Sequence, residues 1–228
     1  PVYHEFITKF AEVLRIDSNG QVLDKVRIPG SHTSLQPVVL ASSAQSAQVF
    51  MRATQGGQVM SSTTQDAGQT WEVAAPLALP NPNSALAGAV LQDGSRWLAL
   101  NPTTVGREKL ALVKLGDPAI KEIAVEPPNQ NGNMASPLGI QDYAAVLSAE
   151  LKSKGVTEAH IAAYVASAQR QLCTGASCAQ EFSYPFLLQS RDGTLHLVYT
   201  WHRTRIKHVR FDLSAISSNQ AVGHDRPN

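Results

Sequence analysis

Three features of this 228-residue chain predict an all-β fold. Short strand-like segments recur in pairs around Asn-Gly, Gly-Gly or Asp-Gly turns, which favour antiparallel hairpins. Over most of the chain, strand follows strand without an intervening helix, which argues against a parallel α/β sheet. The run Thr64–Trp71 reads Thr-x-Asp-x-Gly-x-Thr-Trp. In this spacing the Asp side chain bonds nearby backbone N–H groups, and Gly accepts a positive φ, so a tight turn precedes an outgoing strand.

The turn residues divide the strand-like segments into hairpins. We predict four of them, pairing Phe10–Ile16 with Gln21–Ile28, Gln48–Ala53 with Gln58–Thr64, Ala85–Leu91 with Arg96–Asn101, and Phe186–Gln189 with Thr194–Trp201. The turns between them contain Asn19-Gly20, Gly56-Gly57, Asp93-Gly94 and Asp192-Gly193.

The segment Gln141–Cys173 departs from this pattern and predicts a helical hairpin. Its apolar residues recur at helical spacing in two groups, Tyr143, Val146, Leu147 and Leu151, then Ile161, Tyr164, Val165, Ala168 and Leu172. Gly155 can end the first helix, and Thr157 can cap the second with Glu158 in its first turn. We expect the apolar stripes to be packing surfaces rather than a ligand or membrane site.

Composition excludes several classes of function. A hydrophobic content of 43% can fill a core, and a formal net charge of +1 gives no electrostatic case for nucleic acid or an anionic membrane as partner. No apolar run approaches the ~20 residues needed to span a bilayer. The sequence has no phosphate-binding loop, Ser-His-Asp set or zinc-ligand spacing. We therefore expect neither a cofactor nor a metal.

Cys173 and Cys178 stand in a loop-like Cys-x4-Cys run. They can form a disulfide, which would suggest an exported protein, in the periplasm or secreted. Free thiols and metal binding are the alternatives, although no further metal ligands are close in the sequence.

Three segments of the chain resemble the bacterial family of predicted neuraminidases with BNR, or Asp-box, repeats. They are Ser34–Val39 with Phe50–Arg52 and the Asp-box Thr64–Trp71, then Pro80–Ser84 with Asn101-Pro102 and Gly106-Arg107, then Glu181–Pro185 with Asp192–Trp201 and Arg205–His208. The resemblance covers nearly all of the chain outside the helical insertion.

The resemblance implies a sialidase-like β-propeller of the six-bladed family. A blade takes about 40–45 residues and four strands, so this chain has room for about four blades at most. We expect it to cover part of the propeller, with the N-terminal blades missing. The expected organisation is propeller blades over residues 1–126, the helical insertion with its Cys-x4-Cys loop over 127–180, and C-terminal blade strands over 181–228.

The resemblance also implies roles for particular residues. Arg52 and Arg107 match the second and third arginines that hold the carboxylate of the sugar, a task that suits a guanidinium fork. Tyr184 matches the nucleophile; a neutral phenol avoids the repulsion that a carboxylate nucleophile would meet from an anionic sugar. The first arginine and the acid/base aspartate are expected upstream of this chain.

The partner of the nucleophile departs from the family pattern. The expected glutamate falls at Gln36, and glutamine cannot act as a general base. Glu181 is a possible replacement, but along a strand a spacing of three residues from Tyr184 would place the two on opposite faces.

Four further residues are candidates for the pocket. Asn83 lies in an Asn-Pro-Asn turn and can bond sugar hydroxyls, although the turn alone explains it equally well. His4 and the adjacent Glu5 are candidates for the same pocket, with a structural role as the favoured alternative. Arg205 belongs to the cationic and aromatic run Trp201–His208, which we expect to be a strand that lines it.

The predicted function is exo-glycoside hydrolysis of an acidic sugar such as sialic acid. A carbohydrate-binding or interaction propeller without catalysis is the first alternative, and Gln36 favours it. A glycosidase of the same fold with another sugar is the second. The sequence does not identify the sugar or the oligomeric state.

Overall fold

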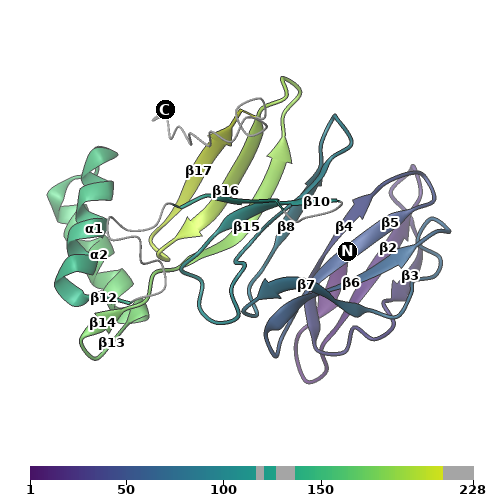
Figure 1. Cartoon of the computed structure of the whole chain (residues 1–228), viewed down its shortest axis with the longest axis horizontal. Helices are drawn as coiled ribbons and strands as arrows, with labels where there is room; N and C mark the ends of the chain where they lie inside the picture. Colours follow the sequence, from purple (N-terminus) through teal and green to yellow (C-terminus); the bar gives the residue numbers. More distant parts are fainter. Residues whose placement is uncertain (117–120, 127–136, 213–228) are drawn as a thin grey trace.

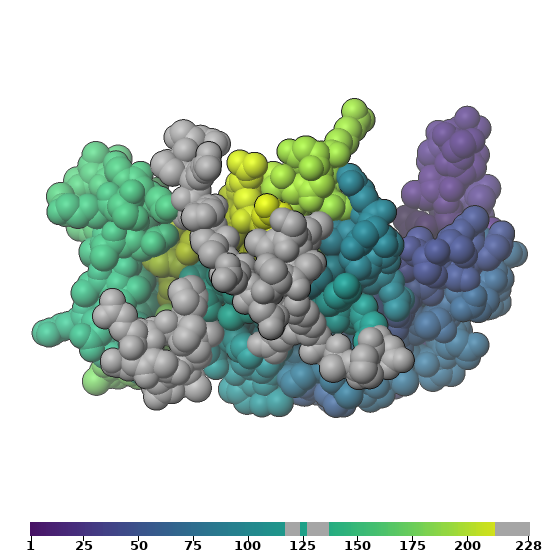
Figure 2. Space-filling model, turned by 45° about the horizontal axis from the view of Figure 1, so that its top comes forward, coloured from purple at the N-terminus to yellow at the C-terminus, as the bar shows by residue number. Residues whose placement is uncertain are grey.

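The computed structural model of the chain describes residues 1–116, 121–126 and 137–212. Antiparallel sheets follow one another along the long axis, and two helices lie at one end (Figure 1). Figure 2 shows the same order on the surface, with the N-terminal strands at one end and the helices at the other. A mostly β fold of antiparallel sheets with a helical hairpin is thus confirmed, whereas closure of the sheets into a ring stays a prediction.

The main sheets consist of strands that pair in chain order. The first contains β1 (Val2–His4), β2 (Phe10–Ile16) and β3 (Val22–Arg27), and the second contains β4 (Ser34–Ala41), β5 (Ala47–Ala53), β6 (Gly57–Thr64) and β7 (Ala75–Asn81). The third contains β8 (Ala87–Val90), β9 (Arg96–Leu100), β10 (Ala111–Leu115) and β11 (Lys121–Ala124), and the fourth β15 (Phe182–Gln189), β16 (Leu195–Trp201) and β17 (Arg205–Phe211).

All four predicted hairpins are present, as β2–β3, β5–β6, β8–β9 and β15–β16. Most strand ends lie within one or two residues of the predicted ones. The exception is β15, which begins at Phe182 rather than Phe186. Its pairing with β16 shifts register between Ser183 and Phe186. The strand therefore continues past a bulge that interrupts the alternation on which the prediction relied.

Apolar cores join each sheet to the next. The strand β5 illustrates the arrangement: Val49 and Met51 pack toward the first sheet, whereas Phe50 packs toward the third. In the same way, Leu98 of β9 packs toward the second sheet and Trp97 toward the fourth. Because successive side chains of a strand point to opposite faces, the second and third sheets are covered on both sides.

The turn Thr64–Trp71 has the contacts that its spacing predicts. The Asp66 carboxylate accepts hydrogen bonds from the Thr70 backbone N–H at 2.9 Å and from the Thr70 and Thr64 hydroxyls at 2.6 and 2.8 Å. Gly68 has a φ of 82°. Trp71 is buried in the core between the first and second sheets. The bonds from Thr70, with that from Thr64, lower the pKa of Asp66 to about 2.

The helices α1 (Ile140–Ser153) and α2 (Glu158–Leu172) form the predicted hairpin, and Gly155 lies between them with a φ of 74°. Their buried stripes are narrower than predicted: Tyr143, Leu147, Leu151, Ile161, Ala168 and Leu172. Val146 and Tyr164 are exposed, because the buried residues of α1 follow a four-residue spacing that excludes Val146. Neither described helix is long and apolar enough to cross a membrane.

Thr157 occupies the predicted N-cap position of α2, but its hydroxyl does not cap the helix. That hydroxyl lies 3.1 Å from His160 Nδ1, and the Thr157 carbonyl accepts the first helical bond, from Ile161 N–H, at 2.9 Å.

Cys173 and Cys178 are joined by a disulfide, as the first of the three alternatives predicts. They belong to a small sheet of β12 (Leu138–Gly139), β13 (Cys173–Thr174) and β14 (Ser177–Cys178). The disulfide ties the end of α2 to the strand that leads into β15. Residues 127–136, at the expected start of the insertion, and 213–228, at the expected C-terminal end, lie outside the described part of the chain.

The Asp66 turn predicts a stability difference that depends on pH. A carboxylate whose folded pKa is lowered stabilises the fold above its ordinary value of 3.8, and this stabilisation is lost as the pH falls through about 2. We expect Asp66→Asn to lower the Tm at pH 7. The difference in Tm between the variant and the unmodified protein, the Tm gap, should close as the pH approaches 2. Thermal unfolding followed by circular dichroism measures the gap. A gap that stays constant over this pH range would contradict the assignment.

Candidate functional site

The predicted site residues lie at one end of the sheets. The tight turns between paired strands, Asp93-Gly94 and Asp192-Gly193, lie at the other end, where Gln92 N–H donates to Gln189 Oε1 at 2.7 Å. Strands β4, β8 and β15 begin at the end of the sheets away from these turns. Strands β5, β9 and β16 finish at that same end. We call it the site end.

A buried carboxylate joins three segments at the site end. Glu181 precedes β15, and its carboxylate accepts from Arg203 Nε at 3.1 and 3.0 Å and from Arg203 Nη2 at 2.8 Å. Ser183 Oγ donates to it at 2.8 Å. On its other side, Arg107 Nη1 lies 3.6 Å away. Two guanidinium groups therefore flank one carboxylate.

Backbone pairing holds the same segments together. Arg107 and Glu181 form an isolated parallel β-bridge, in which Phe182 N–H donates to the Arg107 carbonyl at 2.9 Å. The Asn101 amide donates to the carbonyls of Lys109 and Phe182 at 2.6 and 2.8 Å. The loop that carries Arg107 is thus fixed to the start of β15.

Electrostatics keeps Glu181 ionised. Burial alone raises the pKa of a carboxyl group, but the hydrogen bonds from Arg203 and Ser183, with the charges of Arg203 and Arg107, outweigh it and lower the pKa of Glu181. Arg203 responds in the opposite direction, since its bonds to Glu181 raise its pKa. One negative and two positive charges remain, so the cluster has a net charge of +1.

Tyr184 is exposed beside this cluster. Its ring centroid lies 5.8 Å from the Arg107 guanidinium carbon, and 53% of the residue is accessible to solvent. Glu181 precedes β15 rather than lying along it, so the strand alternation expected to separate it from Tyr184 does not apply, and both residues contact Arg107. Tyr184 has a φ of 52° at the bulge in β15, which breaks the regular alternation.

Arg52 lies in a second group, between the first and second sheets. It is buried at the end of β5, where Nη1 donates to Gln36 Oε1 at 3.0 Å and Nη2 lies 3.5 Å from Glu5 Oε1. Gln36, like Tyr184, has a positive φ at a register shift in the first strand of its sheet. No described contact joins Arg52 to the Glu181 cluster, so the convergence of Arg52, Arg107 and Tyr184 stays a prediction.

The other candidates differ in their placement. The backbone carbonyl of Asn83 accepts from Arg107 Nη2 at 3.3 Å, and Asn83 Oδ1 is buried without a described partner. Asn83 therefore belongs with the Glu181 cluster. His4 is exposed, bonds the Thr8 carbonyl at 2.7 Å and stacks on Phe10.

Arg205 lies apart from the cluster. Its Nη2 donates to Glu150 of α1 at 2.5 Å, and its guanidinium covers Trp201. The run Trp201–His208 is also not one strand, since β16 ends at Trp201 and β17 begins at Arg205. The residues between them form a turn that directs Arg203, rather than Arg205, to the site. The sequence analysis included Arg203 in this run but singled out Arg205, because it treated the turn as strand.

Backbone strain is concentrated at the site end. In the described part of the chain, seven non-glycine residues have a positive φ, and Ala67 is the one that belongs to the Thr64–Trp71 turn. The others are at the site end: Thr33, Gln36, Asn83, Tyr184, His202 and Arg203. Such conformations persist where surrounding contacts enforce them, and they often accompany function.

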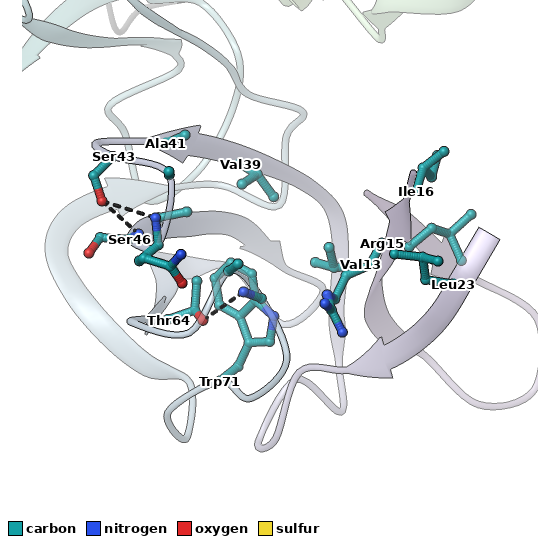
Figure 3. Close-up of a pocket in the computed structure, with 16 residues that line it drawn as sticks. Val13, Arg15, Ile16, Leu23, Val39, Ala41, Ser43, Ser46, Thr64 and Trp71 are labelled. Carbon is teal, nitrogen blue, oxygen red and sulfur yellow. Dashed lines mark hydrogen bonds between the residues drawn. The ribbon is translucent and has the colours of Figure 1, made fainter. Parts of the chain in front are cut away.

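A cavity of about 360 Å³ lies at the opposite end of the sheets, near the Thr64–Trp71 turn. Figure 3 shows it between β2 and the second sheet, with Val13, Val39 and Trp71 among its walls. The charged residue that lines it is Arg15, whose Nη1 is bonded to Asp24 at 2.6 Å. The predicted site residues do not line this cavity. Among the described residues, no group of three or more His, Cys, Asp or Glu side chains could hold a metal ion.

The Glu181 cluster predicts a loss of stability on neutralisation. Glu181→Gln leaves both arginines without their carboxylate, and we expect the free energy of unfolding at pH 7 to fall by about 2 kcal/mol. Because the folded pKa of Glu181 is lowered, this difference should narrow as the pH falls below its ordinary value of 4.5. Urea denaturation at several pH values measures both effects. The matched control is Glu5→Gln, which removes a half-exposed carboxylate 3.5 Å from Arg52 and is expected to change stability by less than about 0.5 kcal/mol. An equal loss in both variants would contradict the assignment.

Comparison with known structures places this geometry in context. The leech intramolecular trans-sialidase superposes with a TM-score of 0.54 at 15% identity, covering 91% of this chain and 28% of that one. The intramolecular trans-sialidase from Ruminococcus gnavus superposes with a TM-score of 0.52 at 15% identity, and the match covers 89% of this chain and 38% of that one. The NanB sialidase from Streptococcus pneumoniae superposes with a TM-score of 0.51 at 11% identity, and the match covers 85% of this chain and 25% of that one. At these identities the likeness shows a shared fold, and this chain spans only a quarter to two fifths of their length.

None of the curated proteins compared with this chain matches it. The family model of the BNR repeat-like domain matches residues 1–197, which is most of the chain. The chain therefore belongs to the BNR repeat-like domain family.

Proposed function

We propose that this chain is part of a sialidase-like β-propeller that hydrolyses the terminal glycosidic bond of an acidic sugar such as sialic acid. The observation that carries the proposal is the cluster of Arg107, Glu181 and Arg203 beside the exposed Tyr184. Its net charge of +1 suits a substrate with one carboxylate. Because the arginines are already oriented by Glu181, the substrate would not have to organise them.

In the proposed reaction, Arg107 and Arg52 hold the sugar carboxylate, and Arg203 adds to the positive field. The Tyr184 hydroxyl passes its proton to solvent as its oxygen attacks the anomeric carbon and the bond to the leaving group breaks. Water then displaces the tyrosine oxygen from the anomeric carbon, and the tyrosine takes a proton back. A group outside this chain supplies the proton to the leaving oxygen. The exposed Tyr184 ring centroid lies 5.8 Å from the Arg107 guanidinium carbon, so the proposed nucleophile and a carboxylate-binding group are side by side.

Glu181 has a different role from the one expected from the sequence. Its carboxylate is bonded to Arg203 and Ser183, and its pKa is lowered, so it is a weak base. It acts by holding Arg107 and Arg203 in place. Gln36 acts similarly on Arg52, because its amide oxygen accepts from the guanidinium.

The proposed propeller requires further blades to cover the outer faces of this chain. Phe186, Leu188 and Ile206 are exposed on the free face of the fourth sheet, and the first sheet has exposed apolar residues in Val22 and Leu23 of β3. The second and third sheets, by contrast, are packed on both faces. The missing N-terminal blades are therefore the proposed partners of these faces.

We also propose that the protein works in the periplasm or outside the cell. The Cys173–Cys178 disulfide supports this location, since such bonds persist mainly in oxidising compartments.

A carbohydrate-binding propeller without catalysis is the second candidate. Gln36 stands where a glutamate is expected, and Glu181 is tied to two arginines. Both observations leave Tyr184 without a described base.

The two candidates differ in the turnover of a fluorogenic sialoside by the whole protein. If the protein is a sialidase, Tyr184→Phe should lower kcat by on the order of a thousandfold, because the nucleophile is lost. Arg107→Lys should raise KM by about tenfold, because a bidentate contact is lost. The matched control is Tyr164→Phe on α2, which should leave kcat and KM unchanged.

Normal turnover by Tyr184→Phe would overturn the assignment of the nucleophile. Saturable sialoside binding without turnover by the unmodified protein would favour the carbohydrate-binding alternative. Absence of both would remove the proposed substrate class.

A further inference from the structure

The turn that carries Arg203 has a strained backbone, because it adopts positive φ without a glycine. His202 and Arg203 have φ values of 47° and 54°, although neither is glycine. The turn is closed by Thr204 N–H, which donates to the Trp201 carbonyl at 3.0 Å. Side chains with a Cβ disfavour this left-handed conformation, so contacts elsewhere must hold the turn.

His202 supplies those contacts on the inner side. It is 1% exposed, and its ring meets Tyr143, Phe182 and Trp201 edge to face at centroid distances of 5.2, 5.1 and 4.4 Å. Its backbone N–H donates to the Glu181 carbonyl at 2.8 Å. His202 is thus anchored to Glu181, the residue whose carboxylate Arg203 binds.

The helical hairpin supplies the remaining contact through Tyr143. This residue of α1 is fully buried, and its hydroxyl lies 3.0 Å from His202 Nδ1. Burial, with smaller contributions from Lys207 and Arg205, lowers the pKa of His202 to about 3. Burial and the nearby Glu181 charge raise the pKa of Tyr143. The tyrosine therefore stays protonated and donates to a neutral imidazole.

We infer that Tyr143 and His202 are positioning residues, through which the helical hairpin sets the placement of Arg203 on Glu181. The chain of contacts runs from the α1 hydroxyl to His202 Nδ1, and from the His202 backbone to Glu181 and Arg203. The helical hairpin thereby holds the turn that carries Arg203 in place, in addition to packing against the fourth sheet. The effect of the hairpin on substrate binding rests on the proposed function, whereas its effect on the geometry of the Arg203–Glu181 pair does not.

The direct test follows the Arg203 Nε–H in ¹H–¹⁵N spectra, with its signal assigned by its loss in Arg203→Lys. Tyr143→Phe removes one buried hydroxyl and keeps the ring. We expect exchange of the Arg203 Nε–H with water to become at least about tenfold faster, because a partner of the strained turn is lost. The matched control on the same hairpin, Tyr164→Phe, should leave the exchange rate unchanged.

Substitutions of His202 provide an independent variant of the test. Asn tolerates the left-handed turn and offers an amide acceptor but removes the ring, so exchange in His202→Asn should lie between that of the unmodified protein and that of His202→Leu. His202→Leu has no acceptor and should match Tyr143→Phe. Unchanged exchange in both Tyr143→Phe and His202→Leu would overturn the inference, because the hairpin would then only pack against the sheet.

The same variants separate this inference from the proposed function. If sialoside is turned over, Tyr143→Phe should raise KM about tenfold while kcat stays within about twofold, as expected when substrate binding alone is weakened. If no variant or parent shows turnover, the proposed function fails, but the exchange of Arg203 still decides whether the hairpin positions it.

Discussion

The ionised carboxylate of Glu181 is the interaction on which the site end depends. It binds Arg203 from the β16–β17 turn and faces Arg107 from the loop after β9. The backbone on either side of it pairs with the same two segments, through Phe182 N–H and His202 N–H. A buried charge is tolerated only when it is paired and hydrogen-bonded, so these segments must meet in one arrangement. The arrangement leaves one positive charge uncompensated beside Tyr184, which is what a carboxylate substrate needs.

The two ends of the sheets differ in how their turns are made. At the end away from the site, glycines close the hairpins, as Gly94 and Gly193 do with φ values of 78° and 87°. Such turns form at little steric cost and need no outside support. At the site end, Gly56 and Gly57 also close a hairpin, but residues with side chains, such as Tyr184 and Arg203, adopt positive φ there as well. Their strain is balanced by long-range contacts, so the loops that carry functional groups are also the loops that depend most on the rest of the fold.

This difference explains how much the sequence could predict. The glycine turns identified all four hairpins, and helical spacing identified α1 and α2. Arg107 and Tyr184 were found because they match a family pattern, and they do lie together. Arg203 was not singled out from its cationic run, since no local signal marks a turn at His202-Arg203 that contacts Tyr143 of a distant helix. The bulge at Tyr184 was also not predicted, because the sequence analysis began that strand at Phe186, after the register shift.

The central claim is that Arg107, held together with Arg203 by Glu181, binds the sugar carboxylate within the positive field of both arginines. It is tested most directly by titrating the protein with N-acetylneuraminic acid while the Nε–H signals of Arg107 and Arg203 are followed by NMR, with the methyl ester of the same sugar as the neutral control. We predict that both signals shift saturably with the free acid and that Glu181→Gln, which releases the arginines, weakens the response. Equal shifts with the methyl ester, or saturable shifts only at residues away from the site end, would contradict the account.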